Sequence, residues 1–388
     1  MVNFDTLSSI FLERYQQTPF CYFAPGRINL IGDHTDYNDG FVLPAAIDKG
    51  IYIALQKNTG SRIRLYAVNY QEEVIVDLNE LKPQSKLWAN YLIGVVNEMQ
   101  EAGYAVGGFD CVFAGDVPIG SGLSSSAALE CGIAFGLNAV FDFHIPKITL
   151  IKMAQSAEHR FAGVQCGIMD QFASMMGKED HALRLDCRSL EYAYFPLDFK
   201  NYQIVLCNTM VKHSLADSGY NERRSQCETG VAIVKKYHPE VRSLRDVTQE
   251  MLSKAKEELG PLIYDRCSFV LEENDRVLNS TDYLLKDDLI NFGKLMFASH
   301  HGLSKKYEVS CPELDFLVEL ASTTEGVLGA RMMGGGFGGC TINLVARDRK
   351  KEIINRFQSA YENEFGITPD CFEVEIRNGT HAYKTHKS

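Results

Sequence analysis

Residues 118–130 read PIGSGLSSSAALE, a short glycine-rich turn that runs into three serines and then a good helical sequence. Glycine lets the backbone approach a ligand closely, and a helix N-terminus offers unpaired N–H groups and the positive end of a dipole. The hydroxyls of Ser124, Ser125 and Ser126 can cap the helix, bind phosphate or ligate a metal. The stretch therefore predicts a phosphate-binding loop, although a plain turn with a serine cap would use the same residues.

Two common nucleotide motifs do not fit this stretch, since it lacks the lysine of GxxxxGK[ST] and the spacing of GxGxxG. Next to it, residues 109–117 are predicted to form a strand and residues 122–140 a helix. Residues 148–161 predict another helix, introduced by Pro146. A preceding helix is marked by a stripe of apolar residues at helical spacing, which comprises Trp88, Tyr91, Leu92, Val95, Val96 and Met99.

Composition limits the class of protein. The 388 residues suffice for two or three domains, and a net charge of −11 without a basic run argues against nucleic acid or anionic membrane as a partner. Eleven scattered cysteines without a CxxC pair predict free thiols in a reducing compartment. With no signal-peptide pattern at the start and no apolar run of about 18 residues, we expect a cytoplasmic protein.

Helical and strand signals alternate irregularly along the chain, which predicts an α+β protein of two domains. An aromatic, acidic stretch around residues 188–200, broken by Pro196, marks the boundary, so the predicted domains are 1–192 and 193–388. Beyond it we expect a strand at 203–208 and helices at 248–260 and 286–300. A turn with five glycines in residues 334–339 then leads into a strand, and that much backbone freedom implies a close approach to something.

A second stretch, residues 24–38, reads APGRINLIGDHTDYN. Two carboxylates, an imidazole and a hydroxyl occupy the four positions Asp33, His34, Thr35 and Asp36. Such a group can exchange several hydrogen bonds with a polyol, and a site built that way rejects analogues that lack or invert one hydroxyl. Taken singly, these residues also suit an ordinary Asx turn, and Arg27 also suits a surface ion pair.

Glu158 lies on the apolar stripe of its predicted helix, where a carboxylate is unfavourable unless it is paired or bound to a metal. It is either a magnesium ligand, with Ser126 supplying a second oxygen, or a residue at the edge of the stripe that reaches water. A third acidic candidate is Asp170. A short helix after Gly167 would place Asp170 on an open face with Ser174, which suits a catalytic carboxylate and equally a solvated surface.

Together these motifs resemble the galactokinase family of the GHMP kinase superfamily. The family's signature matches residues 26–32 and 34–38, the superfamily's ATP motif matches residues 118–127, and its third motif matches residues 333–340. The resemblance runs in order from about residue 20 to the C-terminus. The ATP and glycine motifs alone indicate only the superfamily, whereas residues 27–38 make the resemblance specific to galactokinases.

The resemblance implies a two-domain GHMP kinase fold, with an N-terminal α/β domain, a C-terminal ferredoxin-like domain and the active site between them. It also implies transfer of the ATP γ-phosphoryl group to the anomeric hydroxyl of α-D-galactose, the first committed step of galactose utilisation. ATP is the co-substrate and Mg²⁺ the cofactor, and members of the family are often monomers.

The resemblance assigns roles to individual residues. Asp170 is the catalytic carboxylate, Arg27 stabilises charge on the reacting oxygens, and Ser126 and Glu158 ligate Mg²⁺. The loop that wraps the phosphates consists of Gly120, Ser121, Gly122, Leu123, Ser124, Ser125 and Ser126. The residues that hold galactose are Asp33, His34, Thr35, Asp36 and Tyr220.

One departure from the family concerns Asp33, where galactokinases usually have Glu. The shorter side chain would lengthen a direct sugar contact or route it through water. Two other functions are compatible with the motifs: an N-acetylgalactosamine kinase, or a galactose sensor that binds sugar and ATP without catalysis. Known sensors lose a Ser-Ala pair in the ATP motif, and because Ser126 and Ala127 retain that pair here, catalysis is favoured.

Overall fold

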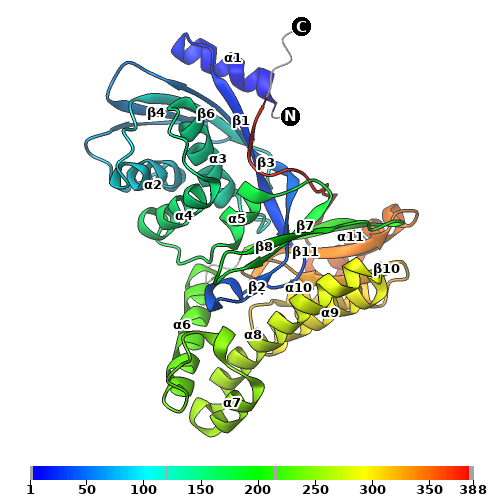
Figure 1. Ribbon diagram of the computed structural model, residues 1–388. Coiled ribbons are helices and arrows are strands. Elements are labelled where there is room, and N and C mark those ends of the chain that lie inside the picture. The colour runs from blue at the N-terminus through cyan, green and yellow to red at the C-terminus, as the bar shows by residue number, and fades with distance from the viewer. Residues whose placement is uncertain (1–2, 119, 213–215, 384–388) are drawn as a thin grey trace.

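The computed structural model describes residues 3–118, 120–212 and 216–383, so Ile119 of the glycine-serine stretch lies outside the described residues. Two assemblies of sheet and helices lie side by side, and a three-stranded sheet lies between them (Figure 1). That small sheet pairs β2 (Phe41–Val42), β7 (His181–Asp186) and β8 (Tyr192–Pro196).

The first assembly is built on a mixed sheet of six strands in the order β13-β1-β3-β6-β4-β5. Only β4 and β6 run parallel, and the other neighbours are antiparallel. The strands are β1 (Phe20–Asn29), β3 (Pro44–Lys57), β4 (Arg62–Ala67), β5 (Glu72–Asp77), β6 (Phe109–Gly115) and β13 (His381–Ala382).

Helices cover both faces of this sheet because successive strand residues point to opposite sides. Tyr22 packs into the larger core, whereas its neighbours Cys21 and Phe23 pack against α1 (Phe4–Tyr15) on the other face. The larger core is covered by α2 (Leu87–Glu101), α3 (Ser125–Val140), α4 (Lys147–Ala157) and α5 (Met169–Met176).

The second assembly has an antiparallel sheet in the order β10-β11-β9-β12. Helices separate its first strand in the chain from its second, and its third from its fourth, which is the ferredoxin-like arrangement. This confirms the predicted fold class. The strands are β9 (Tyr202–Lys212), β10 (Val327–Met332), β11 (Gly338–Ala346) and β12 (Asp370–Glu373).

Most of the second assembly's helices are inserted between β9 and β10. A short 3-10 turn (Leu244–Asp246) precedes α7, and α8 is kinked at Gly260, which has a φ of 65° and is followed by Pro261. The helices are α6 (Ala216–Lys235), α7 (Gln249–Lys254), α8 (Lys256–Leu285), α9 (Leu289–Lys305), α10 (Pro312–Ser322) and, between β11 and β12, α11 (Lys350–Phe365).

A shared apolar core joins the two assemblies. Residues 24–38 form the sugar-type motif. Its residues Ile28 and Leu30 pack in one cluster with Leu206 of β9 and Phe292 of α9. The predicted boundary between residues 192 and 193 falls inside β8, and β13, from the far end of the chain, pairs with β1 (Figure 1). The division into 1–192 and 193–388 therefore stays a prediction.

Several predicted element bounds differ from the structure, and three of these differences lie in or near the glycine-serine loop. The helix after the glycine-serine loop begins at Ser125, and not at residue 122, because Gly122 (φ 72°) and Ser124 (φ 59°) take left-handed conformations that a right-handed helix cannot include. The strand before the loop ends at Gly115 instead of residue 117. The helix predicted to reach residue 161 ends at Ala157 and continues as a π-helical turn, Glu158–Ala162.

All eleven cysteines lie within the described residues, and none of them is in a disulfide. Within the same part of the chain, none of the helices combines the length and the apolar character that a membrane crossing would need.

Candidate active site

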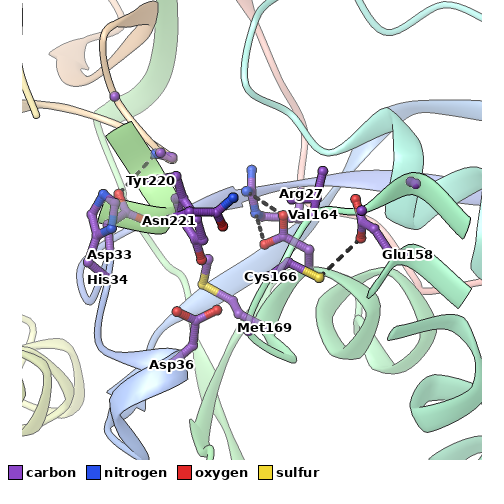
Figure 2. Close-up of a pocket in the computed structure, with 17 residues that line it drawn as sticks. Arg27, Asp33, His34, Asp36, Glu158, Val164, Cys166, Met169, Tyr220 and Asn221 are labelled. Carbon is purple, nitrogen blue, oxygen red and sulfur yellow. Dashed lines mark hydrogen bonds and ion pairs between the residues drawn. The ribbon is translucent and has the colours of Figure 1, made fainter. Parts of the chain in front are cut away.

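A cavity of about 320 Å³ opens where the two assemblies meet. Its walls come from five segments: β1, the loop after β1, the π-helical turn with α5, the start of α6, and the glycine turn (residues 333–337, between β10 and β11). Arg27 lies between the Asp33 and His34 side chains on one side and Glu158 on the other (Figure 2). The lining includes Arg27, Asp33, His34, Asp36, Glu158, Asp170, Tyr220, Gly334, Gly335 and Gly336.

Arg27 and Asp170 form a two-point ion pair in this cavity. Arg27 donates from Nε to Oδ1 and from Nη2 to Oδ2, both at 2.8 Å, and its Nη1 donates to the Gly122 carbonyl at 2.6 Å. Oδ2 of Asp170 also accepts a hydrogen bond from the Ser124 hydroxyl. Burial acts to lower the pKa of Arg27, but Asp170 outweighs it and the pKa is raised. A charged guanidinium therefore links the glycine-serine loop to the predicted catalytic carboxylate.

Asp170 remains partly accessible, with a quarter of its side chain exposed. The predicted open face of its helix is smaller than expected, however. Ser174 was predicted to share that face, but it is buried and its hydroxyl donates to the Pro25 carbonyl at 2.7 Å. This bond closes the helix onto β1, so Asp170 faces the cavity at the helix's first turn.

His34 sits in the cavity wall with a φ of 66°. Its Nδ1 is 2.8 Å from the Tyr37 hydroxyl, which in turn lies 2.7 Å from the Tyr307 hydroxyl, and its ring packs against Tyr220 and Tyr307. Burial lowers the pKa of His34 to about 4, so the imidazole is neutral at physiological pH. A neutral ring can offer one donor or one acceptor to a ligand.

Asp36 faces the same cavity from a 3-10 turn, Asp36–Asn38. Burial and, next, the neighbouring charge of Asp170 raise its pKa to about 7. Its carboxylate lies against the backbone of Gly167, where a Cβ would stand only 1.8 Å from Oδ2. The absence of a side chain at position 167 is therefore what lets Asp36 take this position.

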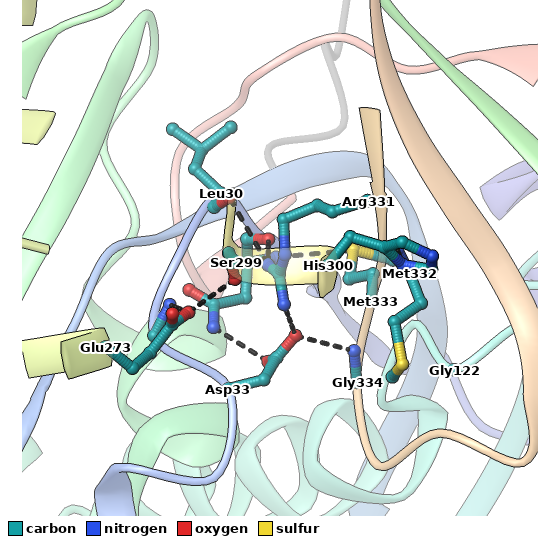
Figure 3. Close-up of polar contacts among 12 residues, drawn as sticks. Leu30, Asp33, Gly122, Glu273, Ser299, His300, Arg331, Met332, Met333 and Gly334 are labelled. Atoms are coloured by element: carbon teal, nitrogen blue, oxygen red, sulfur yellow. Dashed lines mark hydrogen bonds and ion pairs between the residues drawn. The ribbon is translucent and has the colours of Figure 1, made fainter. Parts of the chain in front are cut away.

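Thr35 is not brought to the cavity. Its hydroxyl has a single proton to donate and lies 2.8 Å from the Gly32 carbonyl and 2.6 Å from the Phe41 carbonyl, and the residue is fully buried. The Thr35 hydroxyl therefore bonds within its own turn, where the sequence had predicted a contact with the sugar. Asp33 does line the cavity, but its carboxylate is occupied by other partners of the chain (Figure 3).

Glu158 is 6% exposed, so it does not reach water at the edge of its stripe. Burial raises its pKa, while hydrogen bonds from Cys166, Ser126 and Gln171 act in the opposite direction. The Gln171 amide donates to Oε2 at 2.6 Å. Ser126 and Glu158 thus present neighbouring oxygens at the N-terminal end of α3.

Sequence reasoning missed Glu130, which lies beside this pair. Glu130 is fully buried, and the Gln171 amide donates to it at 3.1 Å. Burial and then the charge of Glu158 raise its pKa well above the ordinary value. Its position, one helical turn after Ser126 on a helix that is otherwise apolar, was a signal that could have found it.

A second cavity, of about 390 Å³, opens on the other side of the glycine-serine loop. Gly120, Ser125 and Ser126 form one wall, and apart from Asn69 the rest is mainly apolar and aromatic. Sequence reasoning assigned Trp88 and Tyr91 only to a helix stripe, which has the same pattern whether it faces a core or a ligand. The aromatic lining residues are Tyr70, Trp88, Tyr91 and Phe113.

In two other residues of the predicted phosphate loop, Ser121 and Leu123, the side chain stabilises the protein and does not face a cavity. Ser121 is buried and its hydroxyl donates to the Pro118 carbonyl at 2.7 Å. Leu123 packs into the core shared by the two assemblies. At these two positions, only the backbone is left to face a ligand.

Comparisons with known proteins agree with this arrangement. A profile described as GHMP kinases N terminal domain matches residues 90–178, and one described as GHMP kinases C terminal matches residues 280–363. The galactokinase galactose-binding signature matches residues 9–57. The fold and the site therefore define a GHMP kinase.

Whole-chain relatives narrow this class. A galactokinase from Clostridium beijerinckii is 41% identical over 386 residues, 98% of this chain and 99% of the relative. One from Thermotoga maritima is 42% identical over 356 residues, 92% and 98% of the two chains. The chain belongs to the galactokinase family.

Solved structures place the fold in the same group. The crystal structure of Lactococcus lactis galactokinase complexed with galactose has a TM-score of 0.94 and 34% identity, and covers 98% of this chain and 99% of that one. A mevalonate kinase from Methanococcus jannaschii has a TM-score of 0.65 at 18% identity over 94% of this chain and all of the other. The latter likeness concerns the fold alone.

Proposed function

We propose that this protein is a sugar kinase that transfers the γ-phosphoryl group of ATP to the anomeric hydroxyl of α-D-galactose, giving galactose 1-phosphate and ADP. The observation that carries the proposal is the Arg27–Asp170 pair. It is bonded to the glycine-serine loop through Gly122 and Ser124, and it shares one cavity with His34 and Asp36. A sugar in that cavity would lie next to a phosphate on the loop.

Phosphoryl transfer has a loose transition state, so positioning and charge neutralisation contribute most of the catalysis. The anomeric oxygen bonds to the γ-phosphorus while the bond from that phosphorus to the bridging oxygen breaks, and ADP leaves with the electron pair. Arg27 would stabilise the charge on the transferring group. Both oxygens of Asp170 already accept hydrogen bonds from Arg27, which favours a role in orienting the hydroxyl and accepting its proton late.

Galactose would be held by the remaining polar groups of the cavity. Asp36 accepts hydrogen bonds from sugar hydroxyls in its ionised form, His34 exchanges one through its imidazole, and Tyr220 closes the wall. Because Asp36 and His34 are buried, a sugar that lacks or inverts a matching hydroxyl would leave a polar group unpaired. This is the physical basis proposed for selectivity.

ATP would extend from the loop into the second cavity. The γ-phosphate lies toward Arg27, the backbone of residues 120–126 contacts the phosphates, and the base stacks among Trp88, Tyr91 and Phe113. Aromatic faces bind a planar base through stacking, which contributes about 1–3 kcal/mol per base.

Mg²⁺ is the proposed cofactor, and the donors present suit it. Ser126 and Glu158 offer two hard oxygens, and Mg²⁺ commonly takes one or two protein ligands and fills its other positions with phosphates and water. Over the described residues, no group of three or more His, Cys, Asp or Glu side chains could hold an ion alone, so the phosphates would complete the site. When bound, the ion would neutralise charge on the phosphates.

An assay of ADP release with galactose, N-acetylgalactosamine, glucose and mevalonate tests the function. We expect turnover with galactose, and a preference for N-acetylgalactosamine would assign the other kinase. Asp170→Asn should abolish turnover while calorimetry shows galactose affinity within about tenfold of the wild type, or about 1.4 kcal/mol. Full activity in that variant would remove Asp170 from the mechanism, and sugar binding without turnover in the wild type would indicate a sensor.

We further propose that the protein is a cytoplasmic monomer. Unpaired cysteines throughout the described residues suit a reducing compartment. Light scattering on the purified protein measures the oligomeric state directly.

A further inference from the structure

The carboxylate of Asp33 accepts three hydrogen bonds from other residues of the chain. Its Oδ1 accepts from the Asn29 amide at 2.8 Å, and its Oδ2 accepts from the Arg331 guanidinium and from the Gly334 N–H, the latter at 3.0 Å. Asp33 is 1% exposed and Arg331 is fully buried. Figure 3 shows the carboxylate pointing at Arg331 and Gly334. These contacts direct the carboxylate toward the second assembly.

Arg331 crosses the boundary between the two assemblies. It leaves the end of β10 and donates from Nη1 to the carbonyls of Asn29, at 2.9 Å, and Leu30, at 3.2 Å. On the other side, Oε1 of Glu273 in α8 accepts from the Gly32 N–H at 2.9 Å (Figure 3). A buried ion pair contributes little net stability, because desolvation offsets its attraction. What it does supply is a defined geometry.

The segment that this ion pair holds in place is the glycine turn, through the Gly334 N–H. Gly334 and Gly336 take left-handed φ values of 82° and 89°, which only glycine adopts readily. A Cβ on Gly334 would lie 3.4 Å from the carbonyl oxygen of Gly122, and one on Gly335 would lie 3.5 Å from the ring of Tyr220. The turn therefore lies between the phosphate loop and the wall of the sugar cavity.

We propose that Asp33 and Arg331 act as a positioning pair, which seats the glycine turn against both substrate subsites. The inference rests on the proposed function, since it concerns how that site is held. The Gly334 N–H lies 3.0 Å from Oδ2 of Asp33, so one more methylene in the side chain would shift the carboxylate from this hydrogen-bonding position. A displaced turn would disturb the ATP side through Gly122 and the sugar side through Tyr220.

Asp33→Glu tests this directly, with KM and kcat measured separately for galactose and ATP. The positioning role predicts that both KM values rise by about tenfold and that kcat/KM falls by about 10- to 100-fold, as expected when catalytic groups are misplaced by about 1 Å. A role confined to a direct sugar contact predicts instead an unchanged ATP KM and a galactose KM that falls, and a side chain without a role at the site predicts that both KM values stay unchanged. Either of these patterns would overturn the proposal.

Two further variants test the pair itself, with thermal unfolding used to establish that each is folded. Asp33→Asn keeps the shape but loses the charge, and Arg331→Lys keeps the charge but loses the two-carbonyl contact, so each should raise both KM values. Their double variant should be no worse than the more damaged single variant if the residues act as one unit. Additive losses would argue against a pair.

The matched control is Asp287→Asn, which removes an exposed ion pair with Lys200 far from the cavity. It should leave both KM values unchanged. If the wild type itself does not phosphorylate galactose, the proposed function fails. The positioning pair is then judged by calorimetric binding of an ATP analogue and galactose to the same variants, and unchanged affinities for both ligands would overturn it.

Discussion

Gly167→Ala is expected to weaken galactose binding strongly, although it adds a single methyl group. A Cβ on Gly167 would lie 1.8 Å from Oδ2 and 2.1 Å from Cγ of Asp36. The backbone at residue 167 is not in the left-handed region, so alanine causes no conformational strain there. Its effect is to displace the Asp36 side chain, whose Cβ would also be only 2.8 Å from the new methyl group.

The size of the effect follows from that displacement. To reach the ~3.5 Å of an ordinary contact, the carboxylate must move by about 1.5 Å, which is enough to break a hydrogen bond to a sugar hydroxyl. A hydrogen bond to a charged group contributes about 1.5–3 kcal/mol. We therefore expect the galactose KM to rise by about 10- to 150-fold, while the KM for ATP changes by less than about twofold.

The measurements are ADP release over a galactose titration and calorimetry of galactose binding without ATP. Gly60→Ala is the matched control, because the nearest atom to its Cβ would be 3.6 Å away, and it should behave as wild type. Thermal unfolding establishes that the variant is folded. A folded Gly167→Ala protein that binds galactose within threefold of the wild type would refute the assignment of Asp36 to the sugar.

Two predictions concern pH and the nucleotide. Because burial and the charge of Asp170 raise the pKa of Asp36 to about 7, kcat/KM for galactose should fall about tenfold per pH unit below pH 7, and Asp36→Asn should lose this limb of the profile. Between about pH 4 and pH 7 the native state keeps a proton on Asp36 that the unfolded state releases, so Asp36 makes the free energy of unfolding decrease as pH rises through this range. A wild-type kcat/KM for galactose that is flat in this range contradicts the first statement, and a free energy of unfolding whose pH dependence is the same in Asp36→Asn contradicts the second. Trp88→Ala should raise the KM for ATP by about 5- to 150-fold through lost stacking and leave the KM for galactose unchanged, and the reverse pattern would exclude the second cavity as the base site.

Local signals made much of the site predictable. The glycine-serine loop, the sugar-type motif and the glycine turn are each continuous in sequence. Seven of the predicted residues do line the central cavity: Arg27, Asp33, His34, Asp36, Glu158, Asp170 and Tyr220. The fold class was predictable for the same reason, because these motifs occur in a fixed order along the chain.

The sequence left the answer open where a local pattern has two physical solutions. The Thr35 hydroxyl can bond to a sugar or within its own turn, and in the structure the Gly32 and Phe41 carbonyls lie within its hydrogen-bonding distance. A stripe that contains Trp88 is identical for a core and for a ligand pocket. Helical projection placed Glu158 correctly on the buried side, but it could not predict that α4 changes to a π-helical turn at that residue.

By itself, then, the sequence determined which chemical groups are available and which backbone segments can approach a phosphate, since both depend on residues that adjoin in the chain. Only the tertiary structure decided which groups pair: Arg27 with Asp170, and Asp33 with Arg331. The physical reason is that a buried charge takes whichever partner the fold brings within hydrogen-bonding distance. Residues separated by some 300 positions meet only once both assemblies have packed around their shared core.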